Sequence, residues 1–293
     1  MAEPWGIVLV ERVTEYLRAV HAVRRVLAFE RSPYQEIAVV ELEGFGKALV
    51  IDNFIQSSQL DEYLYHELLV HPAMVLHDNP RRVLILGGGE GAALREVLKH
   101  PSVEEAVMVD IDARVVELSK EHLPEIHAGS FNDPRARVLI MDGYEYVMRS
   151  QPNSFDVIVM DLTDPYAGEP AQRLYTPEFM AAAKRLLRGG GVLVTQAGNS
   201  LLYHRDYLRV RSAVASAFKH YVEYWTWVPS FSIGVNFILA SDHRDPSRLS
   251  AEEFDARLRE RGVRTKYING RRYAGLVLLG PLEPPEERQR EGQ

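Results

Sequence analysis

The sequence of 293 residues contains no cysteine. This absence excludes disulfide bonds, thiolate metal sites and cysteine nucleophiles. No uninterrupted apolar run approaches the roughly 18–20 residues that a membrane helix requires. The first residues also lack the basic start of a secretory signal, and Glu11 and Arg12 interrupt their apolar stretch. We therefore expect a cytoplasmic protein without a membrane partner.

Basic residues are fewer than acidic residues. The 34 Lys and Arg residues are outnumbered by 41 Asp and Glu residues, which gives a formal net charge of −7. This balance argues against nucleic-acid binding and is compatible with small cationic substrates. We find no internal repeat and no low-complexity linker. The segment 281–293 is rich in proline and charge, and we expect it to be flexible.

Residues 1–75 are predicted to form a small β-rich domain. Gly44-Phe45-Gly46 is typical of a hairpin turn between two short β-branched runs. Residues 61–74 have helical spacing, with Asp61 as the expected cap. His71-Pro72 and Asp78-Asn79-Pro80 are expected to interrupt the chain before the next strand. The predicted strands are Val23–Glu30, Ile37–Glu43 and Lys47–Asp52.

Residues 76–293 are predicted to form the larger, catalytic domain. Continuous apolar strands interleaved with helices indicate an α/β fold with a mostly parallel, doubly wound sheet. Two further runs, 222–227 and 235–240, are expected to add an antiparallel pair at one edge. The predicted strands are 83–86, 106–110, 138–141, 155–161 and 192–196, and the predicted helices are 92–99, 113–122, 144–149, 177–187 and 203–218.

An apolar strand leads into a glycine-rich turn and then directly into a helix. The glycines are Gly87, Gly88, Gly89 and Gly91. Such a turn lets the backbone approach a ligand closely, and the following helix presents its free amide groups to it. The pattern favours binding of a nucleotide-like ligand. A merely structural tight turn is the alternative.

Acidic residues end the strands that follow. Asp110 ends the next strand, where an acid commonly accepts hydrogen bonds from ribose hydroxyls, while Asp112 is expected to cap the following helix. Asp142, followed by Gly143, ends the third strand and could accept from an adenine amino group. Because ligands of open α/β sheets bind at the carboxyl ends of the strands, these acids point to one site.

Two carboxylates, Asp161 and Asp164, flank the end of the fourth strand. Two acids at the ligand edge suit an amine, since one can accept a proton while the other binds a cation. A solvated turn before Pro165 is the alternative. Metal binding is a further alternative, but the histidines show no ligand spacing, so we expect no metal.

Glu90 lies within the glycine turn, where phosphate-binding loops avoid negative charge. A methyltransferase that uses S-adenosylmethionine is the main alternative, but its donor carries a carboxylate. Two negative groups in a partly desolvated site repel each other by several kcal/mol at an effective dielectric constant near 20. If Glu90 faces the ligand, a donor with a bare ammonium group is favoured.

Other polar and aromatic residues are not assigned to the site. The histidines at positions 71, 77, 100, 122, 127 and 204 are expected to be solvated or to cap helices. The aromatic run 221–227 is expected to be a strand that packs on the core, because no basic patch accompanies it.

Several motifs occur in the same order as in a known family, and through them residues 34–196 resemble the polyamine aminopropyltransferases, the spermidine synthase family. That family pairs an N-terminal β domain with a Rossmann-like domain of the class I methyltransferase type, and its members form homodimers or homotetramers. The motifs are Tyr34-Gln35, Gly44-Phe45-Gly46-Lys47, Tyr65-His66-Glu67, residues 83–96, Val109-Asp110-Ile111-Asp112, Asp133-Pro134-Arg135 and Asp161-Leu162-Thr163-Asp164-Pro165.

The resemblance implies transfer of the aminopropyl group from decarboxylated S-adenosylmethionine, a co-substrate, to an amine, and it implies no metal and no cofactor. It implies Asp161 as the base, assisted by the Tyr65 hydroxyl, and Glu90 as the group that binds the aminopropyl ammonium. It implies that His66 and Asp164 line the amine channel. The methylthioadenosine part would be held by Gln35, Asp110, Asp142, Gly143 and Pro170.

The acceptor side departs from the family pattern. Leu162 replaces the usual serine or cysteine, and Phe231 stands where a tyrosine hydroxyl is expected. The resemblance implies putrescine, agmatine or a longer polyamine as the acceptor, and these differences favour agmatine or a triamine. A polyamine-binding module without catalytic activity is the third alternative.

Overall fold

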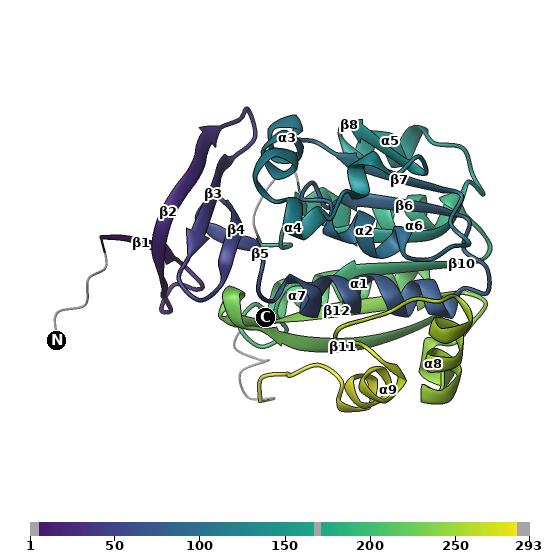
Figure 1. The fold of residues 1–293 in the computed structure, drawn as a ribbon. Coiled ribbons are helices and arrows are strands. Elements are labelled where there is room, and N and C mark those ends of the chain that lie inside the picture. Colours follow the sequence, from purple (N-terminus) through teal and green to yellow (C-terminus); the bar gives the residue numbers. More distant parts are fainter. Residues whose placement is uncertain (1–5, 167–170, 286–293) are drawn as a thin grey trace.

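The computed structural model describes residues 6–166 and 171–285, which form two β-sheets side by side (Figure 1). The N-terminal sheet is antiparallel and follows chain order. Gly44 and Gly46 adopt positive φ angles of 78° and 73° in the turn between β3 and β4, which confirms the predicted hairpin. Its strands are β1 (Ile7–Glu11), β2 (Ala19–Arg31), β3 (Glu36–Leu42), β4 (Gly46–Ile51) and β5 (Phe54–Ser58).

Helix α1 (Glu62–Leu76) joins the two sheets and is buried along most of its length. Asp61 precedes it but makes no capping hydrogen bond, so the predicted side-chain cap is wrong. Its carboxylate instead accepts hydrogen bonds from the hydroxyls of Ser58 and Ser230, at 2.7 and 2.8 Å. The bond from Ser230 ties the start of α1 to a segment that is distant in sequence.

The expected interruption at His71-Pro72 is also wrong, because α1 continues through Pro72 to Leu76. Proline has no amide hydrogen to donate to the carbonyl four residues earlier. That carbonyl, of Leu68, accepts a hydrogen bond of 2.9 Å from the hydroxyl of Tyr224. The tertiary structure thus supplies the donor that Pro72 lacks.

The second sheet has seven strands in the order β11-β12-β10-β9-β6-β7-β8. The five strands from β10 to β8 are parallel, while β11 and β12 form the predicted antiparallel pair at one edge. This arrangement confirms the predicted α/β class. The strands are β6 (Arg82–Gly87), β7 (Glu105–Asp110), β8 (Ala136–Ile140), β9 (Phe155–Asp161), β10 (Leu187–Gln196), β11 (His220–Val228) and β12 (Ile233–Ser241).

Helices cover both faces of this sheet, as the interleaved pattern predicted. Successive strand residues face opposite sides, so that Val83 and Ile85 pack with α1 and α2, while Leu84 and Leu86 pack with α5 to α7. The helices are α2 (Ala92–Leu98), α3 (Ala113–His122), α4 (Pro124–His127), α5 (Gly143–Arg149), α6 (Pro177–Leu186), α7 (His204–Ala217), α8 (Ala251–Glu260) and α9 (Gly270–Leu279).

The N-terminal sheet packs on the larger part of the molecule through one of its faces. Ile37, Val39 and Leu49 contact residues of α3 and α4. Helix α1 contacts β9, β10 and α2, so it packs with the larger sheet although its sequence falls within the predicted domain 1–75. The predicted division at residue 75 stays a prediction.

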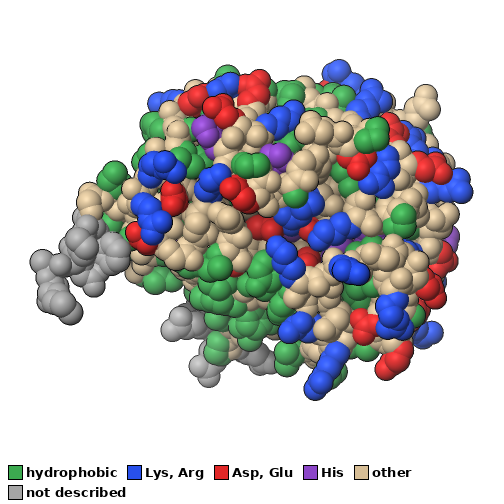
Figure 2. All heavy atoms as spheres, viewed as in Figure 1, with side chains coloured by type: hydrophobic (Ala, Val, Ile, Leu, Met, Phe, Trp, Pro, Cys, Tyr) green, Lys and Arg blue, Asp and Glu red, His purple; other side chains and the backbone are tan. Residues whose placement is uncertain are grey.

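The surface carries charges of both signs. Basic and acidic side chains are interspersed on the face that Figure 2 shows. Within residues 6–166 and 171–285, no helix combines the length and apolar character needed to cross a bilayer. Residues 286–293, most of the segment expected to be flexible, lie outside the described residues.

Candidate active site

A cavity of about 570 Å³ lies at the carboxyl edge of the parallel sheet. The strand order reverses between β6 and β9, and such a switch point is where open α/β sheets bind ligands. One wall comes from the ends of β6, β7 and β9, and the opposite wall comes from the N-terminal sheet. The predicted site residues that line it are Gln35, Tyr65, Gly87, Gly88, Gly89, Glu90, Asp110, Asp142, Gly143, Asp161 and Asp164.

The glycine turn brings β6 against the end of β9. Gly87 pairs with Asp161 in the parallel register and has a φ of 79°. A Cβ atom at this position would lie 2.1 Å from the carbonyl oxygen of Asp161. Only glycine permits this approach, which places the turn next to the Asp161 side chain.

Asp161 ends β9 and is buried. Tyr65 of α1 donates a hydrogen bond of 2.9 Å to its Oδ1 atom, while Oδ2 has no hydrogen-bond partner among the described residues. Burial and the nearby Glu90 carboxylate raise the pKa of Asp161 to about 7, although the His66 imidazolium and the Tyr65 hydroxyl oppose this shift. Asp161 can therefore exchange a proton near neutral pH. Its burial argues against the alternative that this segment is only a solvated turn.

His66 lies one residue further along α1 and is buried between two carboxylates. Its Nε2 atom is 2.8 Å from Glu90 Oε1, and its Nδ1 atom is 2.9 Å from Glu62 Oε2. Burial alone would lower the pKa of His66, but these hydrogen bonds and charges raise it to about 10. His66 is thus an imidazolium that donates to both carboxylates at neutral pH. Glu90 lines the cavity, as predicted, with one oxygen held by His66.

Asp110 ends β7, and its carboxylate accepts a hydrogen bond of 2.9 Å from the amide of Asp112. Burial raises the pKa of Asp110 to about 6. Asp112 caps α3 by accepting from the Arg114 amide, as predicted. Gln35 donates its side-chain amide to Asp112 at 3.0 Å, so the N-terminal sheet is connected to this end of the cavity.

Asp142 and Gly143 follow β8, at the start of α5. Asp142 accepts a hydrogen bond of 2.8 Å from the Tyr144 amide and pairs with the guanidinium of Arg173. Sequence reasoning missed Arg173, which lies 31 positions away and has no motif around it. The carboxylate of Asp142 is therefore already paired with a cation.

Asp164 follows β9, lines the same cavity as Asp161 and is half-buried. Burial raises its pKa to about 6, while hydrogen bonds from Tyr166 and Gln196 favour its charged form. Gln196 ends β10, and its position at a strand terminus was a signal that could have identified it. Pro170, predicted for the adenine-side loop, lies outside the described residues.

The first strand contributes a residue that sequence reasoning also missed. Glu11, at the end of β1, lines the cavity and is buried. It accepts a hydrogen bond from the Ile55 amide at 2.6 Å, and its other oxygen lies 2.9 Å from His21 Nε2. Glu11 lies outside the resembling segment, and only the fold brings it to the cavity.

His71 and His100 differ from the prediction that they are solvated or cap helices. Both are fully buried. His71 lies 2.8 Å from Glu96 through Nε2 and 3.0 Å from His100 through Nδ1. They belong to a polar cluster between α1 and α2 that no local pattern indicates.

His66, Glu90 and Asp161 place possible metal-ligand atoms within 4.8 Å of one another. A histidine ligand must offer a nitrogen lone pair, whereas both nitrogens of His66 donate to carboxylates. The donor set fits protonated amines better than a metal ion. The expectation of no metal and no cofactor stays a prediction.

Two family models match the chain. The model described as "Spermine/spermidine synthase domain" matches residues 62–249, and the model described as "Spermidine synthase tetramerisation domain" matches residues 7–59. The first covers the seven-stranded sheet and the strand-end acids. The second covers the N-terminal sheet.

Known proteins resemble nearly the whole chain. Polyamine aminopropyltransferase 1 of Hyperthermus butylicus is 53% identical over 272 residues, which cover 92% of this chain and 93% of the relative. Polyamine aminopropyltransferase of Pyrobaculum arsenaticum is 55% identical over 276 residues, covering 94% and 96%. The crystal structure of a spermidine synthase in complex with the transition-state analogue AdoDATO superposes with a TM-score of 0.88 at 30% identity, covering 98% and 94% of the two chains.

Proposed function

The chain belongs to the spermine/spermidine synthase family, and we propose that it elongates agmatine or a triamine, with tolerance for other amines. It is an aminopropyltransferase, which transfers the aminopropyl group of decarboxylated S-adenosylmethionine to an amine and releases 5′-methylthioadenosine. The methyltransferase alternative is not favoured. The observation that carries the function is that Glu90, Asp161 and Asp164 line one cavity with the glycine turn.

The adenosine part of the donor is proposed to lie against the ends of β7 and β8. Asp110 would accept hydrogen bonds from the ribose hydroxyls, and Asp142 with Gly143 would contact the adenine. Gln35, from the N-terminal sheet, would cover the adenosine part on the opposite wall of the cavity. All four residues line the cavity, and Pro170 completes the proposed set.

The reacting end is proposed to lie between Glu90 and Asp161. The oxygen of Glu90 that His66 does not bind would receive the ammonium of the aminopropyl arm. The acceptor amine would lie against Asp161, with Asp164 along its channel. His66 was also predicted to line this channel, but it is 1% exposed and is not among the residues that line the cavity, so it would act through its bond to Glu90. Tyr65 would orient the Asp161 carboxylate through their hydrogen bond.

The chemistry follows from the charge of the acceptor. A primary amine with a pKa near 10.4 is almost entirely protonated at neutral pH and has no free electron pair. Asp161 accepts that proton. The freed nitrogen then forms a bond to the methylene carbon beside the sulfonium, and the carbon–sulfur bond breaks with its electron pair on sulfur. Because Asp161 titrates near pH 7, it can accept the proton in that range.

The part of the cavity proposed to hold the acceptor amine is lined by apolar residues, which supports an acceptor with a long methylene chain. Leu162, Phe231, Ile233 and Val235 line the cavity there, which suits the methylene chain of an extended amine. Phe231 packs edge-to-face on Tyr65, with ring centroids 6.0 Å apart, and offers no hydroxyl. Glu11 lines the same cavity, and its carboxylate, which also bonds the Ile55 amide and His21, would place a negative charge near a distal cation.

A product assay tests the function. The protein is incubated with each donor and with putrescine, agmatine, cadaverine, spermidine or norspermidine, and the nucleoside and the amine products are separated by chromatography. Methylthioadenosine from the decarboxylated donor is expected, with the highest turnover for agmatine or a triamine. A preference for putrescine would contradict the proposed acceptor. S-adenosylhomocysteine would favour the methyltransferase reading.

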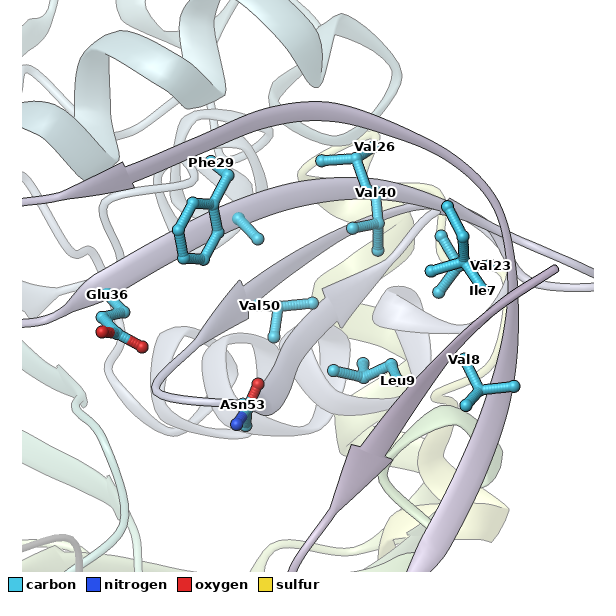
Figure 3. Close-up of a pocket in the computed structure, with 11 residues that line it drawn as sticks. Ile7, Val8, Leu9, Val23, Val26, Phe29, Glu36, Val40, Val50 and Asn53 are labelled. Atoms are coloured by element: carbon cyan, nitrogen blue, oxygen red, sulfur yellow. The ribbon is translucent and has the colours of Figure 1, made fainter.

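Self-association is proposed for the N-terminal sheet, which matches the tetramerisation family. Figure 3 shows an apolar hollow on this sheet, where Val26, Phe29, Val40 and Val50 project from adjacent strands. Phe29 is 67% exposed and Val26 is 46% exposed, and both line this hollow together with other apolar residues. Apolar side chains gathered in one exposed patch, rather than scattered singly, mark interaction sites. We propose that a second copy of the chain covers this face in a homodimer or homotetramer. The cytoplasmic location stays a prediction.

A further inference from the structure

Glu62 is one of the two carboxylates that bond His66, and among the described residues it does not line the cavity. Its Oε2 atom accepts from His66 Nδ1 at 2.9 Å and from Arg95 Nη2 at 2.8 Å. The side chain of Glu62 is 3% exposed and that of His66 is 1% exposed. Arg95 is held in turn by Glu96, 2.7 Å from its Nε atom. Sequence reasoning gave none of Glu62, Arg95 and Glu96 a role.

We propose that Glu62 is a positioning residue: it holds His66 as a fixed cation that keeps Asp161 ionised and ready to accept the proton of the amine. This inference rests on the proposed role of Asp161 as the base. Glu62 contacts neither substrate in this arrangement and acts only through His66.

The charges that face Asp161 explain why His66 matters. Glu90 and Asp110 are acids that raise the pKa of Asp161, as burial does. His66 Nε2, 3.9 Å from Asp161 Oδ2, is the only basic side chain of the described residues within 4.0 Å of this carboxylate. A neutral His66 would leave Asp161 protonated at neutral pH and unable to act as a base. The titratable groups around Asp161 are Tyr65 and His66 from α1, Glu90 from the glycine turn, Asp110 from β7 and Tyr175.

The geometry makes a glutamine substitution informative. Both donors reach the same oxygen of Glu62, so a glutamine can keep both hydrogen bonds while it removes the negative charge. Arg95 would then lie close to His66 without an intervening anion. Both changes lower the pKa of His66, and the loss of its charge raises the pKa of Asp161.

The test is the pH dependence of single-turnover methylthioadenosine formation at saturating donor and amine. In Glu62→Gln, the acid limb is expected to move to higher pH by about one to two units. Turnover at pH 7 is expected to fall about tenfold or more and to recover as the pH rises. Glu96→Gln is the matched control, because Glu96 is 1% exposed and bonded to Arg95 but does not touch His66. Its acid limb is expected to stay in place.

An acid limb that does not move in Glu62→Gln, or that moves equally in Glu96→Gln, would overturn the proposal. Nitrogen-15 NMR of the wild-type chain with labelled histidine gives a second readout that does not depend on the folding of a variant. The resonances of His66, assigned by their loss in His66→Gln, are expected to be those of an imidazolium at pH 8. A neutral His66 at that pH would refute the inference. If the wild type forms no methylthioadenosine with any amine, the proposed function fails instead.

Discussion

Single residues of this site differ in how their environments set their charge. Asp161 Oδ2 and His66 Nε2 lie 3.9 Å apart in one buried cluster. Burial and neighbouring acids raise the pKa of Asp161 to about 7. Two carboxylates raise the pKa of His66 to about 10. Between these two values, His66 is a cation and Asp161 is an anion. That window is where the site combines a fixed positive charge with an available base.

Replacement of Asp161 by asparagine tests the base. Turnover is expected to fall by about 10²- to 10⁴-fold, because the amide keeps the shape but cannot accept the proton. Methylthioadenosine binding, measured by calorimetry, is expected to change little. In the wild type, the rate is expected to fall as the pH drops below about 7, since protonation of Asp161 removes the base.

The control for this change is Asp156→Asn at the other end of β9. Asp156 is 5% exposed and accepts hydrogen bonds from the Arg81 and Arg82 amides at 2.8 Å. This variant is expected to lose stability and to keep the rate of the chemical step. Equal rates for wild type and Asp161→Asn would show that another group removes the proton.

Replacement of Glu90 by glutamine tests the ammonium site. The dissociation constant of decarboxylated S-adenosylmethionine is expected to rise by about 10- to 100-fold, as for the loss of a charged hydrogen bond. Methylthioadenosine, which has no ammonium, is expected to bind nearly as well as before. Calorimetry of the two ligands provides the comparison, and equal weakening of both would rule out contact between Glu90 and the ammonium.

At the scale of elements, helix α1 depends on residues that lie far from it in the sequence. Its last turn contains no basic residue, but Arg257 and Arg261 of the C-terminal region donate to the carbonyls of Val75 and Met74, at 2.7 and 2.5 Å. These cations pair with carbonyls that have no amide donor within the helix, and they oppose the negative end of the helix dipole. They hold in place the helix that carries Tyr65 and His66.

The bond between Tyr224 and the Leu68 carbonyl predicts a coupling with Pro72. Tyr224→Phe is expected to lower the free energy of unfolding by about 1–2 kcal/mol, because it leaves a buried carbonyl unpaired. In a Pro72→Ala background, the alanine amide can pair with that carbonyl. Tyr224→Phe is therefore expected to lower the free energy of unfolding by less in this background. Denaturant unfolding of the four chains measures the coupling, and additive effects would contradict this explanation.

At the scale of the whole molecule, the exposed apolar face of the N-terminal sheet predicts assembly through this sheet. Phe29→Glu places a charge in the hollow that a second copy is proposed to cover, and it is expected to reduce the mass measured by light scattering after gel filtration. Ile140→Glu, at a residue 47% exposed on β8, is the control and is expected to keep the wild-type mass. An unchanged mass for Phe29→Glu would place the interface elsewhere.

The sequence determined the alternation of strands and helices, the glycine turn and the acids at the strand ends. These features are local: each strand and helix has its own periodicity, and the carboxyl ends of parallel strands necessarily meet at one edge of a sheet. Asp110, Asp142, Asp161 and Asp164 could therefore be assigned to one site from their positions in the sequence, and all four line the cavity.

The tertiary structure alone decided what those acids face and which of them are charged. The pairing of His66 with Glu62 and Glu90, the contact of Arg173 with Asp142 and the arrival of Glu11 at the cavity each join distant segments or depend on burial. The burial of His71 and the passage of α1 through Pro72 have the same origin. A pKa and a buried hydrogen bond depend on everything packed around the group, which a local pattern of residues does not specify.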